Sequence, residues 1–292
     1  MLAVDVGGTK LAAAVIAGDG SMLAADQVAT PQTDLAEEVF AALVGVIDRV
    51  RSMTTAVPVI CGVGCGGPML PKGETVSPLN IRAWNHFPLR RRLIEATGLE
   101  VAVDNDAKAL ALGEGWLGAA QGTDNFIAMV VSTGIGGGIV LDGGLLDGAL
   151  GNAGHIGHVV VEPDGRTCVC GGRGCLEAEA SGLSIEASTG RPAAQASDQV
   201  RRRCGTLVGR AVASVANLLD LELAVVGGSV ALGFGEPFFA AAQAEIAFRA
   251  RLDFSRSTRI IPAGLGPDGP LVGASAVGLQ MLGSRSAEGS LR

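Results

Sequence analysis

The sequence repeats one pattern of apolar and polar positions at two places. Residues 2–23 and residues 127–148 each contain an apolar run, a glycine-rich turn and a second apolar run. Short apolar runs bounded by glycine are typical of buried strands, so each stretch predicts a strand, a tight turn and a strand. A hairpin that recurs in this way indicates a duplicated α/β domain, with the two glycine turns facing one another across a cleft.

The intervals between the hairpins carry the spacing of helices. Apolar residues recur every three or four positions from Leu35 to Val50, while Pro88 and Gly98 mark the ends of a second helix. Residues 223–232 combine a buried strand, a third glycine turn and the start of a helix. Further helices are expected at residues 107–117, 198–219, 236–252 and 270–282, and further strands at residues 99–106 and 259–265.

A chain of 292 residues is too long for one small core, so we expect two domains joined by short hinges. We place a small N-terminal α/β domain at residues 1–107 and a larger C-terminal α/β domain at residues 108–292. A C-terminal helix at about residues 270–284 is free to pack back on the smaller domain.

Composition narrows the class of partner. The net charge of −7 argues against a nucleic-acid or anionic-membrane surface, and no apolar run reaches the roughly 20 residues of a membrane span. Met1 is followed at once by a strand-like run rather than by a basic leader segment. A soluble cytoplasmic protein is therefore expected, without nucleic-acid or membrane partners.

Residues 151–177 concentrate the chemistry of the chain. They hold two of the three histidines and three of the six cysteines, with Cys168, Cys170 and Cys175 spaced C-x-C-x4-C and His158 upstream. One imidazole and three thiols on a glycine-rich loop form a closed structural zinc set. The alternatives are a disulfide with a spare thiol, or buried apolar cysteines. His155 is interpreted as a residue of a ligand pocket or as a structural histidine, rather than a fifth metal ligand.

The glycine turns are candidates for phosphate binding. The first turn carries Asp5, Thr9 and Lys10, and the second carries Thr133, so backbone amides and polar side chains could face a phosphate. A plain β-hairpin is the alternative for the first turn, and the second copy of the pattern weighs against it. The third turn follows a strand and precedes a helix, which is a common place for the base or ribose of a nucleotide.

Asn105 and Asp106 stand at the carboxyl end of a predicted strand. Ligands bind at such strand ends in open α/β sheets, so Asp106 is a candidate catalytic residue. It could also be the N-cap of the following helix, and the two roles are compatible.

These motifs together resemble one family over nearly the whole chain, the ROK family (repressors, open reading frames, kinases) of the actin-like ATPase superfamily. The motifs in order are DVGGTK near the start, NDA at 105–107, STGIGGGI at 132–139, the G-x-x-G-x-x-GH run ending at His158, C-x-C-G-x-x-G-C-x-E, and GGS at 227–229. The resemblance implies two ribonuclease-H-like domains with a cleft between them. It also implies an ATP-dependent kinase that phosphorylates the 6-hydroxyl group of a hexose.

The resemblance also assigns site residues. Asp106 would be the catalytic base. The implied sugar-binding residues are Gly67, Asn80, Asn105, Asp106, His155, His158 and Glu177. Asp5, Gly8, Thr9, Lys10, Thr133 and Gly134 would bind phosphate and the magnesium shell, and Gly227 and Gly228 the adenosine. Structural zinc would be held by His158, Cys168, Cys170 and Cys175. The implied partners are ATP and a hexose or N-acyl hexosamine, in a homodimer or homotetramer.

One position departs from the glucokinase pattern. Kinases for glucose usually carry Glu where this chain has His155, and bacterial N-acetylmannosamine kinases of the family can carry His there. Glucose is placed slightly ahead of N-acetylmannosamine because glucokinase activity is common in the family. A transcriptional repressor is disfavoured by the absence of an N-terminal helix-turn-helix segment, and a non-catalytic sugar-binding protein by the intact Asp106 and phosphate turns.

Overall fold

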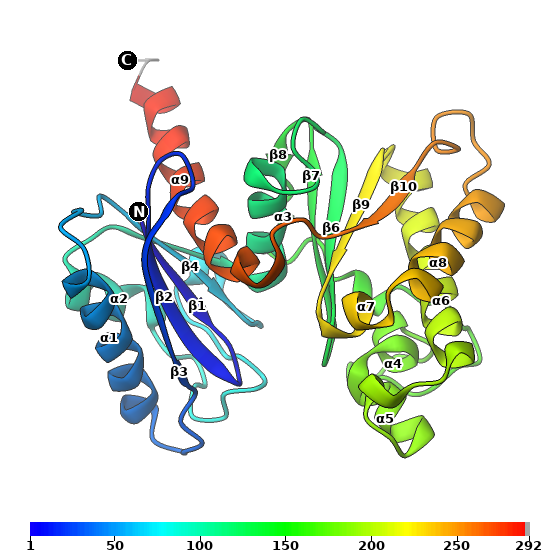
Figure 1. The fold of residues 1–292 in the computed structure, drawn as a ribbon, viewed down its shortest axis with the longest axis horizontal. Coiled ribbons are helices and arrows are strands. Elements are labelled where there is room, and N and C mark those ends of the chain that lie inside the picture. The colour runs from blue at the N-terminus through cyan, green and yellow to red at the C-terminus, as the bar shows by residue number, and fades with distance from the viewer. Residues whose placement is uncertain (290–292) are drawn as a thin grey trace. The chain divides into compact units, whose positions relative to one another are not determined.

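The computed structural model describes residues 1–289 and divides them into two compact α/β units, each built on a five-stranded sheet (Figure 1). Unit 1 contains residues 1–117, 148–151 and 267–289, and unit 2 contains residues 118–147 and 152–266. The chain leaves unit 1 after Leu117 rather than after residue 107, because helix α3 (Asp106–Leu117) packs along helix α9 (Gly269–Gly289).

The sheet of unit 1 has the strand order β3-β2-β1-β4-β5. Its strands are β1 (Leu2–Val6), β2 (Lys10–Ile16), β3 (Met22–Ala29), β4 (Cys61–Cys65) and β5 (Val101–Asn105). β1 and β2 are antiparallel, as are β2 and β3, whereas β1, β4 and β5 run parallel. The carboxyl ends of three strands therefore lie at one edge of the sheet.

Both faces of this sheet are covered. Side chains alternate between the faces of a strand, so Leu2, Val4 and Val6 pack toward α1 (Ala36–Ser52) and α2 (Leu89–Thr97). Ala3 and Ala14 face the other way, toward α9. A Cβ atom on Gly62 of β4 would lie 1.9 Å from the carbonyl oxygen of Ala274, so only glycine lets α9 come this close. A short 3₁₀ turn, η1 (Pro71–Gly73), precedes α2.

The sheet of unit 2 has the strand order β10-β9-β6-β7-β8. Its strands are β6 (Phe126–Val131), β7 (Ile135–Leu141), β8 (Gly144–Leu145), β9 (Leu223–Gly227) and β10 (Arg259–Pro262). Its α-helices are α4 (Leu176–Ala180), α5 (Gly182–Thr189), α6 (Asp198–Leu219), α7 (Ser229–Phe234) and α8 (Glu236–Arg249). The 3₁₀ turns of this unit are η2 (Ile156–His158) and η3 (Ala193–Gln195), and η4 (Gly266–Asp268) lies where the chain returns to unit 1. Ile127, Met129 and Val131 of β6 join the core that α6 and α8 complete.

The two sheets share one topology. Read from the other edge, the second sheet is β8-β7-β6-β9-β10, which matches β3-β2-β1-β4-β5 strand for strand. In each sheet an antiparallel meander is followed by two strands parallel to its first strand. The predicted α/β fold with a repeated hairpin is confirmed. Helix α8 and strand β10 end three residues earlier than expected, and α9 begins at Gly269 and continues to Gly289.

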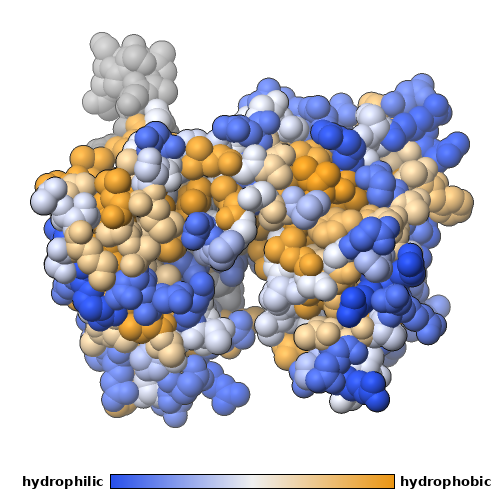
Figure 2. All heavy atoms as spheres, viewed as in Figure 1, coloured by the Kyte–Doolittle hydropathy of each residue, from blue (hydrophilic) through white to orange (hydrophobic). Residues whose placement is uncertain are grey.

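Apolar side chains also reach the surface of both units. On the visible face they are interspersed with hydrophilic residues (Figure 2). Scattered exposed apolar residues are normal in folded proteins. Among residues 1–289, no helix is both long enough and apolar enough to cross a membrane.

Candidate functional site

Unit 1 gathers its polar site residues at the carboxyl ends of parallel strands. The register of the sheet places Asp5 beside Gly64 and Gly64 beside Asp104, while Cys65 lies beside Asn105. Gly7, Gly8 and Thr9 form the turn that follows β1. Carboxyl ends of parallel strands commonly hold ligands in α/β sheets. The register places the carboxyl ends of β1 and β5 on the same side of this sheet.

Close backbone contacts join the neighbouring loops to this edge. A Cβ atom on Gly8 would lie 2.3 Å from the Cβ atom of Asn80, so the phosphate turn and the segment before α2 touch there. A Cβ atom on Gly67 would lie 3.4 Å from the side-chain nitrogen of Asn105. The sequence-predicted residues Gly8, Gly67, Asn80 and Asn105 are therefore neighbours within unit 1.

Asn105 and Asp106 begin helix α3. The side-chain oxygen of Asn105 accepts the N–H of Ala107 at 3.0 Å, which is the contact made by an N-cap residue. Oδ1 of Asp106 accepts the same N–H at 2.8 Å, so both side chains contact the start of the helix. Asp106 is the first residue of α3, and its side chain is exposed. The carboxylate of Asp106 is therefore exposed beside a strand end, which is where ligands bind in α/β sheets.

Asp5 is the buried carboxylate of this cluster. Its pKa is raised to about 7, chiefly by burial and also by the negative charge of Asp106, while the nearby Lys10 opposes the shift. The buried thiol of Cys65 has a pKa raised well above its usual value by burial and by the charges of Asp106 and Asp5. The carboxylates of Asp5 and Asp106 therefore lie close enough at these strand ends for each charge to affect its neighbours.

In unit 2 the turn between β6 and β7 carries Thr133 and Gly134. The carboxylate of Glu177, on α4, accepts the N–H of Ile135 through Oε2 at 2.8 Å. A Cβ atom on Gly134 would lie 2.9 Å from the same oxygen, so a side chain at Gly134 would displace Glu177. One hydrogen bond thus connects a predicted sugar residue with a predicted phosphate turn.

The same turn contacts the strand end of β9. The hydroxyl groups of Ser132 and Ser229 lie 2.9 Å apart, and the N–H of Gly182 donates to the carbonyl of Ser132 at 2.7 Å. Gly228 has a positive φ of 95°, and a Cβ atom there would lie 2.4 Å from the carbonyl oxygen of Val131. The turns at 133–134 and 227–228 are therefore adjacent.

His155 and His158 belong to a segment that lies against β7. Cβ atoms on Gly154 and Gly157 would each lie 2.2 Å from a backbone oxygen of β7, on Gly137 and Ile135 respectively. His155 is exposed, and its ring centre is 6.2 Å from that of His158. The glycines of the motif fix the path of the two histidines through close backbone packing.

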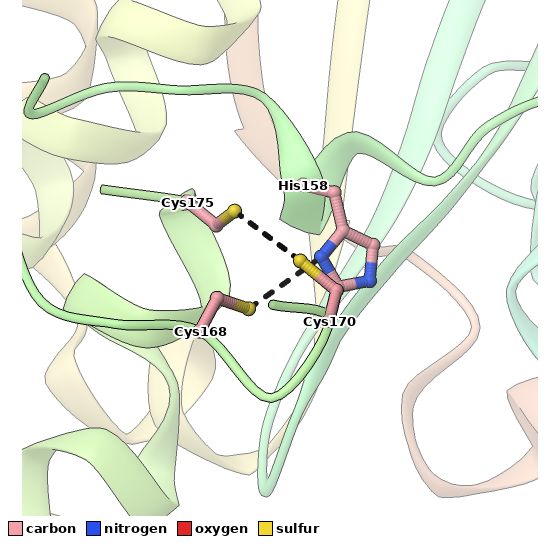
Figure 3. Close-up of side chains that lie close together, drawn as sticks. All are labelled: His158, Cys168, Cys170 and Cys175. Carbon is pink, nitrogen blue, oxygen red and sulfur yellow. Dashed lines mark hydrogen bonds between the residues drawn. The ribbon is translucent and has the colours of Figure 1, made fainter. Parts of the chain in front are cut away.

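Residues 166–175 form a loop that we call the cysteine hairpin. Thr167 and Arg173 form a β-bridge at its neck, and Cys175 forms a second bridge with Val160. The four side chains of His158, Cys168, Cys170 and Cys175 converge at one point (Figure 3). Their nitrogen and sulfur atoms all lie within 4.8 Å of one another. This group could hold a metal ion.

The thiols of the cluster are free and differ in their surroundings. Sγ of Cys170 is 3.7 Å from Sγ of Cys175, and Sγ of Cys168 is 3.7 Å from Nδ1 of His158. A backbone hydrogen bond with Gly172 lowers the pKa of the exposed Cys170 thiol, whereas burial raises the pKa of Cys175 to about 12. The disulfide alternative is not adopted in this structure.

A family model described as the ROK family matches residues 1–280. The chain belongs to the ROK family. An N-acetylmannosamine kinase from Yersinia pseudotuberculosis serotype O:1b (strain IP 31758) is 36% identical over 250 residues, which is 80% of this chain and 84% of that protein. The family predicted from the motifs is confirmed.

Solved structures of ROK proteins have the same fold. The ROK hexokinase from Thermus thermophilus superposes with a TM-score of 0.83 at 32% identity, covering 97% of this chain and 99% of that one. A ROK family glucokinase from Streptomyces griseus, solved with glucose and AMPPNP, gives a TM-score of 0.81 at 30% identity over 96% and 99% of the two chains. These relatives are the class of enzyme expected from the sequence, sugar kinases.

The structure also reveals residues that sequence reasoning missed in this ROK protein. Cys65 lies close enough to Asp5 and Asp106 to be affected by their charges, and Ser132 contacts Ser229. Each adjoins a glycine turn or strand end, which is the signal that could have identified them. Glu179 is buried, and although burial by itself raises its pKa, hydrogen bonds from Arg166 and Arg203 lower it overall. Its sequence position gave no sign of this.

Asp5→Asn is expected to stabilise the protein more at pH 8 than at pH 5. The pKa of Asp5 is about 7 in the folded protein, compared with the ordinary value of 3.8 that applies to the unfolded chain. The folded state therefore becomes more stable as the pH falls through 7, and the gain is complete below pH 3.8. The buried charge is a cost that the amide removes, and this cost is larger at pH 8 than at pH 5 by roughly 3 kcal/mol. Thermal unfolding without added divalent cations measures it. The exposed Asp48→Asn is the control, and an equal effect of Asp5→Asn at both pH values would contradict the shift.

Proposed function

We propose that this sugar kinase transfers the γ-phosphoryl group of ATP to the 6-hydroxyl group of N-acetylmannosamine. The N-acetylmannosamine kinase relative shares 36% identity over 250 residues with this chain. His155 supports the same sugar, because neutral imidazole offers one donor and one acceptor where a glutamate would only accept. Glucose is the second candidate, supported by the hexokinase and glucokinase structures that cover nearly the whole chain.

The observation that carries the proposal is the exposed carboxylate of Asp106 at the carboxyl end of β5. Phosphoryl transfer requires alignment, charge neutralisation and a group that takes the proton of the attacking hydroxyl. In this proposal Asp106 accepts that proton. The proposed sugar contacts are Gly67, Asn80, Asn105, His155, His158 and Glu177.

The glycine turns are proposed to bind the nucleotide. Backbone amides at Gly8 and Gly134 and the side chains of Thr9, Lys10 and Thr133 suit phosphate oxygens. Gly227 and Gly228 precede α7 and suit the adenosine. The carboxylate of Asp5 and the hydroxyl of Thr9 are hard oxygen donors of the kind that Mg²⁺ prefers. Bound with ATP, Mg²⁺ would neutralise charge that develops on the transferred phosphoryl group.

Zinc is proposed for the cluster on the cysteine hairpin. Tetrahedral bonds of about 2.3 Å to sulfur and 2.0–2.1 Å to nitrogen separate two sulfurs by roughly 3.8 Å and a sulfur from a nitrogen by roughly 3.6 Å. The two 3.7 Å separations in the cluster fit these values. Four protein ligands leave no open position, so the role would be structural, and Cys175 adjoins α4, which carries Glu177.

The proposed activity is tested by a coupled kinase assay with glucose, mannose, N-acetylglucosamine and N-acetylmannosamine at equal concentration. N-acetylmannosamine is expected to give the highest kcat/KM. A higher kcat/KM for glucose would change the assigned sugar but leave the kinase activity in place. If none of the four sugars is phosphorylated, the proposed reaction is rejected.

Asp106→Asn is expected to lower kcat by roughly 10²-fold or more, because the attacking hydroxyl loses its proton acceptor. Sugar affinity, measured by calorimetry, should stay near that of the wild type because the amide keeps the size of the side chain. A variant that retains more than half of the wild-type kcat would remove Asp106 from the mechanism.

His155→Glu is expected to shift the ratio of kcat/KM values toward glucose by about tenfold, the effect of one changed buried hydrogen bond. The measurement is the same assay on the two sugars. If total activity falls but the ratio stays within about twofold, residue 155 supports its loop and does not select the sugar.

Cys170→Ser is expected to lower both the metal content and the melting temperature, since metal binding and local folding are coupled. Elemental analysis of wild-type protein purified without chelator should find about one zinc per chain. The matched control is Cys204→Ser, a buried cysteine of α6 outside the cluster, which should keep its zinc. Wild-type protein without zinc would reject the site.

A further inference from the structure

Glu179 is a buried carboxylate that the proposed reaction does not use. It lies on the short helix α4, two positions after Glu177, and only 3% of it is exposed. Glu177 contacts the turn before β7, whereas Glu179 contacts Arg166 and Arg203. A buried carboxylate is costly unless it is paired and hydrogen-bonded, so its partners show what it holds in place.

Both oxygens of Glu179 are engaged. Oε1 accepts the backbone N–H of Arg166 at 2.6 Å, and Oε2 accepts Nη2 of Arg203 at 2.8 Å. Nη1 of Arg203 also donates to the carbonyl oxygen of Glu179 at 3.1 Å. Arg203 belongs to α6, which forms much of the core of unit 2. Glu179 therefore connects the first residue of the cysteine hairpin with the longest described helix of this unit.

The two ends of the hairpin are joined by backbone hydrogen bonding, because the N–H of Gly174 donates to the carbonyl oxygen of Arg166 at 2.8 Å. Cys175, at the far end, is the N-cap of α4, and its carbonyl oxygen accepts the N–H of Glu179 at 3.2 Å as the first hydrogen bond of that helix. The side chain of Glu179 adds to these backbone contacts by fastening residue 166 to α6. A Cβ atom on Gly165 would lie 2.4 Å from Oε1, which explains a glycine directly before the hairpin.

A second arginine strengthens this arrangement. Nη1 of Arg166 donates to the hydroxyl of Ser184 at 2.8 Å and to the carbonyl of Ala178 at 3.4 Å. The hairpin base is thus fastened to α4, α5 and α6 together. Because Glu177 and Glu179 share the rigid five-residue helix α4, fixing one side of this helix limits movement on the other.

We propose that Glu179 is a positioning residue that fastens the base of the cysteine hairpin to α6 and thereby fixes Glu177 for the sugar. The second half of this statement rests on the proposed role of Glu177 in sugar binding. The first half depends on neither the sugar nor the metal.

The test uses full-length protein and the variants Glu179→Gln and Glu186→Gln. The first keeps the size of the side chain and removes the charge opposite Arg203, and the second makes the same change at an exposed position of α5. Hydrogen exchange of residues 166–175 is followed by mass spectrometry with and without chelator. Steady-state kinetics give KM for the sugar, KM for ATP and kcat.

Glu179→Gln is expected to speed exchange of the hairpin amides by about tenfold in both conditions and to raise KM for the sugar by about tenfold, the effect of one charge-assisted hydrogen bond. KM for ATP and kcat should change by less than about twofold. A merely structural role would instead lower the folded fraction, and with it kcat, at unchanged KM. If Glu179→Gln fails to fold, Arg203→Gln is used instead. It removes the same ion pair by changing the half-exposed arginine, and it should change exchange and KM in the same direction.

If the hairpin amides of Glu179→Gln exchange no faster than those of Glu186→Gln, Glu179 does not fasten the hairpin. If they exchange faster but KM for the sugar is unchanged, Glu179 does not position Glu177. If the wild type phosphorylates no sugar, the proposed function fails separately. Hydrogen exchange then still tests whether Glu179 fastens the hairpin. Calorimetric titration with N-acetylmannosamine and glucose tests the effect of Glu179→Gln on sugar binding. If sugar affinity is unchanged, or if no binding is detected, the link to Glu177 is overturned.

Discussion

The structure depends on backbones that approach one another too closely for any side chain. Gly62 lets α9 cover the first sheet, and Gly154 and Gly157 let the histidine segment lie on β7. Gly228 brings the strand end of β9 against β6 in the same way. At such crossings a Cβ atom would overlap a carbonyl oxygen, so the 44 glycines of the chain are partly a packing requirement and not only a turn requirement.

Close packing at the site is accompanied by buried negative charge. Asp5 is held beside Asp106 although burial and repulsion raise its pKa to about 7. Glu179 is also buried but has a guanidinium and a backbone N–H as partners, so its pKa is lowered. The two pKa values differ because Asp5 lies beside a like charge, whereas Glu179 is paired with an opposite charge and hydrogen-bonded.

Glu177 connects these local arrangements. It lies on the helix that follows Cys175, and it accepts the N–H of Ile135 at the end of the glycine turn 133–134. The residues of this turn also contact Ser229 and the N-terminus of α5. The cysteine cluster, the predicted sugar residue and two predicted nucleotide turns of unit 2 thus form one continuous network of contacts.

The sequence by itself determined the α/β fold, the repeated hairpin and the family. Each follows from local pattern, since apolar periodicity selects strands and helices and the glycine, cysteine and histidine motifs have characteristic spacing. It also singled out His158, Cys168, Cys170 and Cys175, which the structure brings together. The sequence left open whether the C-terminal helix packs on the first domain, and the tertiary structure decided that α9 covers the first sheet. Only the tertiary structure showed that Asn105 and Asp106 both accept the N–H of Ala107, and that Glu179 is buried on Arg203. These features arise from contacts between segments far apart in the chain or from the direction of single side chains, and neither leaves a periodic trace in the sequence.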